Sequence, residues 1–145
     1  MITIRGEKEL YARIAKLSNV NAGNTDKAME FALNPMLNQT ITNARALRQR
    51  HTPKGGHLDE GVVSQKVKAY SRTENVWWVS FKGRARYLAH LVEFGTRPHD
   101  QPRRHSFHPG AVPKPFFRPA FEGHKIDTLT RLGQAVWEIF KLNLS

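Results

Sequence analysis

The sequence contains no cysteine, which excludes disulfide bonds and thiolate metal sites. It has no run approaching the roughly 20 apolar residues of a membrane-spanning helix. Its first residues, MITIRGEKELYARI, lack the apolar core of a secretory signal. Gly55 and Gly56 do not form a phosphate-binding loop, because the required spacing and following helix are missing. We therefore expect a protein without a membrane span or disulfides, suited to assembly in a reducing cytoplasm.

Acidic residues are also scarce, since 12 Asp and Glu stand against 23 Lys and Arg, for a net charge of +11. This excess suits a nucleic acid or an acidic protein partner, and it also favours solubility alone. A chain of 145 residues is most simply one domain, 1–145. A domain of this size buries enough surface to form a hydrophobic core without disulfides or metals.

Two amphipathic helices are predicted in the first third of the chain. Residues 7–18 carry one apolar stripe. The second helix is predicted to begin at an N-cap on Asn24 or Thr25 and to run to about Arg50. Pro35 should kink this helix without dividing it, because the apolar stripe continues beyond the proline. The inward side of the second helix is predicted to comprise Phe31 or Ala32, Met36, Leu37, Ile41, Ala44 and Leu47.

A β-hairpin and a final helix follow. Residues 61–71 and 76–82 alternate in the manner of strands and should pair antiparallel. Trp78 should point away from the face formed by its neighbours, toward a second layer or a partner. These elements predict an α+β fold, in which a small antiparallel sheet packs against two or three helices. The last helix, from Pro119 to about Leu144, should turn inward Ile126, Leu129, Leu132, Val136 and Phe140.

The segment 87–121 organises the rest of the chain. Residues 87–94 have helical apolar spacing, and Gly95 is placed to end that helix with a positive φ. A strand is the alternative, because periodicity alone does not distinguish the two in so short an apolar run. A long loop rich in Pro, His and Arg, residues 97–114, should project from the fold. Pro119 suits the first turn of the last helix. The aromatic residues predicted to hold the far end of the loop on the domain are Phe116, Phe117 and Phe121.

The sequence offers only weak candidates for metal or catalytic chemistry. The spacing of His99, His105 and His108 matches no structural zinc pattern, so solvated loop histidines are favoured. His90 and Glu93 stand three residues apart, a spacing that some acid–base sites use. The favoured alternative has Glu93 accepting hydrogen bonds from backbone N–H groups of the adjoining loop. We therefore predict no catalytic residue, no metal and no cofactor.

Three motifs follow one another near the C-terminus: Val92-Glu93-Phe94-Gly95-Thr96, His108-Pro109-Gly110 and Pro115-Phe116-Phe117-Arg118-Pro119-Ala120. In this order they resemble the signature of the neck and tail-completion family, small minor tail components of long-tailed double-stranded DNA bacteriophages and prophages. Members of that family often show VEFGT, a loop with HPG, and PFLRPA. They also begin with two helices and a basic loop containing Thr-Gly, where this chain has Pro53-Lys54-Gly55-Gly56.

The resemblance implies a non-catalytic structural subunit of a phage or prophage neck or tail, acting in tail completion and head–tail joining. Such subunits are expected to form a homo-oligomeric ring around the DNA channel, in contact with other neck and tail proteins and with packaged DNA. Their place would be the virion neck or tail, and the host bacterial cytoplasm during assembly. The residues alone leave open a sequence-independent nucleic-acid-binding domain or a small basic nuclease around His51, His57, Arg48 and Lys54, which lacks clustered carboxylates.

Two sets of residues are the candidates for function. The candidates for assembly or DNA contact are the basic residues Arg97, Arg103, Arg104, Lys114, Arg118, Arg48 and Lys54. The residues that the resemblance marks as structural are Glu93, Phe94, Gly95, Thr96, Pro115, Phe116, Arg118 and Pro119.

Overall fold

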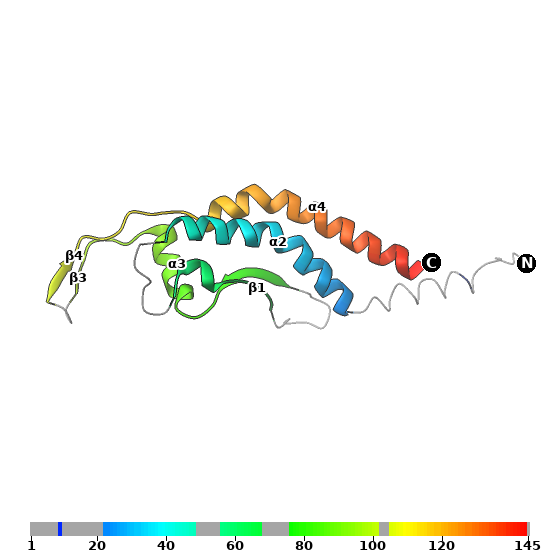
Figure 1. Cartoon of the computed structure of the whole chain (residues 1–145), viewed down its shortest axis with the longest axis horizontal. Coiled ribbons are helices and arrows are strands. Elements are labelled where there is room, and N and C mark those ends of the chain that lie inside the picture. Colours follow the sequence, from blue (N-terminus) through cyan, green and yellow to red (C-terminus); the bar gives the residue numbers. More distant parts are fainter. Residues whose placement is uncertain (1–8, 10–21, 49–55, 68–75, 102–104, 145) are drawn as a thin grey trace, which may run out of the picture.

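Two long helices lie side by side, and the other elements pack along one of them or project beyond its end (Figure 1). The structure is a computed structural model that describes residues 9, 22–48, 56–67, 76–101 and 105–144. Antiparallel strand pairs combine with helices, which confirms the predicted α+β class. The elements in chain order are α2 (Ala22–Ala46), η1 (Leu58–Gly61), β1 (Val62–Lys66), β2 (Trp77–Phe81), α3 (Ala85–Phe94), β3 (His99–Gln101), β4 (Ser106–His108) and α4 (Phe117–Leu144).

Helix α2 continues through Pro35, as predicted, and Figure 1 shows its axis changing direction along its length. Proline removes one backbone hydrogen bond, but Ala32 and Met36 are both buried, so packing holds the helix on either side of it. The predicted N-cap was wrong, because Asn24 and Thr25 lie within the helix. The predicted first helix, residues 7–18, lies outside the described residues apart from Glu9, which is helical.

The core forms where α2, the β1–β2 hairpin, α3 and the start of α4 meet. The pairing Val62↔Phe81 confirms the predicted antiparallel hairpin and brings both side chains to the core face. The Phe81 ring stands edge-on to those of Phe116 and Phe117, with centroids 5.7 and 5.9 Å away. Trp78 is 51% exposed on the other face, in agreement with its predicted direction. The buried members of the core cluster are Ala44, Val62, Ala89 and Phe116.

Two of the five apolar residues predicted to face inward on α4, Ile126 and Leu129, face solvent instead, while Leu132, Val136 and Phe140 are partly buried. Ile126 and Leu129 are 67% and 64% exposed. The side of α4 that lies on α2 begins with Phe117 and Ala120, and the helical period continues that side through a mixture of polar and apolar residues. Its later members are the partly buried His124, Asp127, Thr128, Arg131, Leu132, Ala135 and Ile139.

Small residues and one cation–π contact hold the two long helices together. Ala28 and Ala32 are buried on α2, and Ala120 is buried on α4. Phe31, one of two alternatives for the inward side, is half exposed, and the guanidinium of Arg131 lies 5.8 Å from its ring centroid. No helix in the described part of the chain combines the length and apolarity needed to cross a bilayer.

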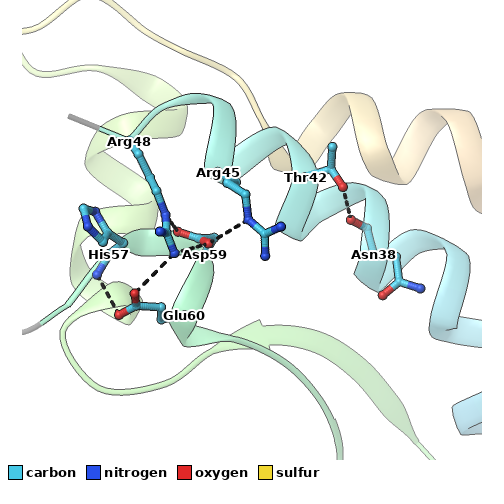
Figure 2. Close-up of polar contacts among 7 residues, drawn as sticks. All are labelled: Asn38, Thr42, Arg45, Arg48, His57, Asp59 and Glu60. Atoms are coloured by element: carbon cyan, nitrogen blue, oxygen red, sulfur yellow. Dashed lines mark hydrogen bonds and ion pairs between the residues drawn. The ribbon is translucent and has the colours of Figure 1, made fainter. Parts of the chain in front are cut away.

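A charged network joins the end of α2 to η1 (Figure 2). Arg48 donates to both carboxylate oxygens of Asp59, at 2.9 and 2.8 Å, and its Nη2 also reaches Glu60 Oε1 at 3.2 Å. The Asp59 side chain is only 2% exposed, so this bidentate pair compensates the cost of burying a carboxylate. Arg45 adds a longer contact of 3.4 Å. The hydrogen bond from Arg48 holds the pKa of Asp59 below its usual range.

We predict that Asp59→Asn lowers the free energy of unfolding at neutral pH by about 1–3 kcal/mol, because a buried hydrogen bond to a charged group is lost. The folded pKa of Asp59 is depressed, so its contribution is complete above the unfolded pKa of about 4 and disappears as pH falls through the folded value. Chemical denaturation across an acid pH series should therefore show the free energies of unfolding of wild type and variant converging.

The control Asp127→Asn removes a more exposed pair with Arg131 and should change stability by no more than about 0.5 kcal/mol. Equal losses in the two variants would contradict this account.

Candidate assembly site at the base of the arm

The carboxylate of Glu93 forms the N-terminal cap of α4. Glu93 is at the end of α3, is 9% exposed, and accepts the backbone N–H groups of Phe116, Phe117 and Arg118 at 2.8, 3.0 and 3.0 Å. The first N–H groups of a helix have no partner within it, and its positive dipole end favours a carboxylate. The favoured alternative for Glu93, hydrogen bonding to backbone N–H groups, is thus confirmed, but the donors lie at the start of α4 rather than in the adjoining loop. Asn43 of α2 completes the junction by donating to the Phe116 carbonyl at 2.9 Å.

Two chain segments form a close antiparallel bridge just beyond α3, at Gly95-Thr96 and Gly110-Ala111, which we call the crossing. Thr96 and Ala111 exchange backbone hydrogen bonds of 2.9 and 3.0 Å. Gly95 has φ 71° and ψ −175°, which confirms its predicted positive φ and is a combination open essentially to glycine. A Cβ on Gly95 would meet the Ala111 carbonyl and stand 2.8 Å from Pro113 N, while one on Gly110 would stand 2.5 Å from Thr96 O. Each glycine therefore allows the backbone of the opposite segment to approach.

Beyond this crossing, residues 97–101 and 105–110 project from the fold as an arm that contains β3 and β4 (Figure 1). The segment expected to be a loop thus contains two paired antiparallel strands. His99 lies opposite His108, and their rings stack with centroids 5.1 Å apart. The Gly110 N–H donates to His108 Nδ1 at 3.0 Å, which ties that ring to the base of the arm.

A hollow of about 1130 Å³ lies between the end of α2, η1, α3 and the two chain segments at the base of the arm. We call it the basal hollow. Large apolar side chains of α3 face it, including Leu88, Leu91 and Tyr87, so these residues serve the hollow rather than the core. Tyr87 and Phe94 are 71% and 64% exposed, while the buried side of α3 consists of Ala85, Ala89 and Glu93. The basic residues around the basal hollow are Arg48, Arg84, Arg97, Lys114, His57, His99 and His108.

The structure brings some of the predicted basic residues together and separates others. Arg97 and Lys114 stand on the basal hollow, whereas Arg118 is exposed in the first turn of α4. Arg48 also reaches the hollow, but it is engaged by Asp59. The predicted candidates Arg103, Arg104 and Lys54 lie outside the described residues.

The residues of the three motifs meet at one junction. Phe116 is 1% exposed and Phe117 packs against the core, but Phe121 is 44% exposed, so two phenylalanines rather than three hold the arm. The Lys114 N–H donates to Val92 O at 2.8 Å and fixes the segment before Pro115, which is exposed. Pro119 occupies the first turn of α4, as predicted.

Sequence reasoning missed Asn43, Ala111 and Asp59. Asn43 donates to a carbonyl 73 residues away, so no local spacing marks it.

Within the described residues, no group of three His, Asp or Glu is arranged to hold a metal ion. Comparisons with protein families, with curated proteins and with solved structures found no match to this chain.

We predict that Glu93→Gln lowers the free energy of unfolding by about 1.5–3 kcal/mol, because the amide removes the charge and turns an NH₂ donor toward backbone donors. Amide hydrogen exchange at Phe116, Phe117 and Arg118 should accelerate selectively. The control Glu138→Gln, in an exposed pair with Lys141, should be nearly neutral. Wild-type protection of these three amides in the Glu93 variant would refute the capping role.

We also predict that Gly95→Val, and even Gly95→Ala, lowers the free energy of unfolding by more than about 1 kcal/mol. The strained φ and the collision with the crossing segment both act in the folded state. Gly133→Ala is the control, since Gly133 lies in α4 with open space around the added Cβ, and it should raise stability by about 0.4–1 kcal/mol. Thermal and chemical denaturation measure both effects. A Gly95→Ala protein as stable as wild type would show that the crossing tolerates a side chain.

Proposed function

We propose that this protein is a structural subunit of the neck or tail of a bacteriophage or prophage, acting in tail completion and head–tail joining. The observation that carries the proposal is that the three motifs of the resemblance meet at a single junction. Glu93 of the first motif caps the helix opened by the third, and Gly110 of the second crosses Thr96 of the first. A shared arrangement of this kind explains why the motifs occur together and in order.

The exposed surface suits assembly. The arm extends away from the helices, and α4 turns Ile126, Leu129 and Trp137 outward, the last 58% exposed. A row of large apolar side chains on a helix is a feature of surfaces that associate. We infer that copies of the chain form a ring, with other neck and tail proteins as neighbours and with packaged DNA near its basic side. The protein would then reside in the virion, after assembly in the bacterial cytoplasm.

We propose a role without catalysis. At the base of the arm, the buried Glu93 bonds to three main-chain N–H groups and the partly buried Asn43 to a main-chain carbonyl. His57 belongs to the turn before η1, where its backbone N–H donates to Glu60 at 3.0 Å. These hydrogen bonds give Glu93 and Asn43 a role in holding the fold.

The test replaces residues 98–109 by a short Gly/Ser linker and keeps Gly95, Thr96, Gly110 and Ala111, so that the crossing is preserved. Loop-closure entropy changes slowly with length, by about 0.6 kcal/mol per doubling, so thermal unfolding should be close to that of the wild type. The variant should fail to complement a phage lacking the gene and should yield separate heads and tails. The control Ser106→Ala, an exposed position in β4, should complement normally.

Two outcomes would contradict the proposal. Infectious particles built with the shortened arm would show that the arm is dispensable for assembly. Reproducible cleavage of DNA or RNA by the purified wild type, lost in His51→Ala, would instead identify the basic nuclease alternative.

A further inference from the structure

The basal hollow combines an apolar surface with a cationic rim. Part of its lining is apolar and includes Leu88 and Leu91 of α3 and Val112, which is 79% exposed. The rim is cationic, with Arg97 and Lys114 on the two segments that leave and re-enter the fold. Both cations are exposed, and neither forms an ion pair with a described carboxylate.

No acidic side chain lines the hollow among the described residues. Strand alternation explains this on the arm, where His99 and Gln101 face the hollow and Asp100 between them does not. Glu93 turns to the start of α4, and Asp59 turns to Arg48. These two carboxylates thus have partners within the fold, and Arg97 and Lys114 have no carboxylate partner among the described residues.

Size and chemistry together define the ligand. The volume of about 1130 Å³ exceeds the roughly 300–1,000 Å³ typical of small-molecule sites, so several amino-acid side chains fit inside. A nucleic acid backbone would use the cations but would leave the apolar lining in contact with water. A peptide with apolar and acidic side chains would use both, because apolar burial adds affinity and the cations steer and orient it.

We propose that the basal hollow is a docking site for an acidic, apolar peptide segment of a partner protein. Leu88, Leu91 and Val112 receive the apolar side chains, and Arg97 and Lys114 bind the carboxylates. This assignment concerns the hollow itself and does not depend on the phage role, so either can fail while the other stands.

The experiment selects binders from a random library of displayed peptides about ten residues long. The purified full chain is the bait at an ionic strength of about 0.15 M. Enriched sequences should be rich in Asp and Glu interspersed with Leu, Ile, Phe or Trp. A synthetic copy of the most enriched peptide, labelled with fluorescein, then gives affinities by anisotropy. Circular dichroism and thermal unfolding establish that each variant is folded.

Charge reversal provides the first readout. Arg97→Glu and Lys114→Glu should each lower the affinity for the peptide by about tenfold or more, because the new carboxylate at the rim repels the carboxylates of the peptide. The matched control Lys27→Glu, an exposed position on α2 away from the hollow, should change affinity by less than about twofold. Loss of affinity equal to that of the control would show that binding follows net charge alone, and the proposal would be wrong.

The apolar lining provides the second readout. Val112→Asn should weaken peptide binding by about fivefold or more while leaving the net charge unchanged, because burial of the apolar side chain is lost. Duplex DNA is the competitor. DNA that displaces the peptide at the peptide's own concentration, binding that Val112→Asn leaves intact, or a selection without enrichment of acidic and apolar residues would each overturn the proposal.

Discussion

The carboxylate of Glu93 is the constraint on which the arrangement of the C-terminal third depends. By accepting the N–H groups of Phe116, Phe117 and Arg118, it fixes both where α4 begins and how the helix is rotated about its axis. Three hydrogen bonds to one buried carboxylate define a direction as well as a position, because their donors follow the first turn of the helix. Phe116 then enters the core beside Phe81, and α4 has no freedom to turn a different side toward α2.

The outward apolar face of α4 follows from this rotation. With Phe117 and Ala120 turned inward, the helical period places Arg131 near α2 and leaves Ile126 and Leu129 in solvent. The side of α4 toward α2 consequently carries Ala120, polar groups and partly buried apolar residues such as Leu132, and Arg131 contacts the Phe31 ring. The free energy that burying the larger side chains would supply remains available for association with another surface.

The same junction determines what the arm can do. Main-chain hydrogen bonds between Thr96 and Ala111 hold the crossing together, and the missing Cβ atoms of Gly95 and Gly110 allow the two segments to approach closely. The arm therefore leaves the fold at a fixed place. Carboxylates near this crossing are used internally, Glu93 as a cap and Asp59 as a partner of Arg48. The local surface therefore carries more positive charge than the composition alone implies. The internal use of these carboxylates thus has two results: it fixes the base of the arm, and it leaves the hollow electropositive.

The sequence by itself determined the α+β class, the helix through Pro35, the β1–β2 hairpin, the short helix α3 and the positive φ of Gly95. Each of these depends on neighbouring residues, through periodicity, ring geometry or the missing Cβ. Only the tertiary structure decided which face of α4 is buried, that Asn43 bonds to a carbonyl 73 residues away, and that α3 gives its large side chains to a hollow. An apolar stripe indicates that a helix is amphipathic, but contacts between segments distant in sequence determine which side of the helix packs on the core.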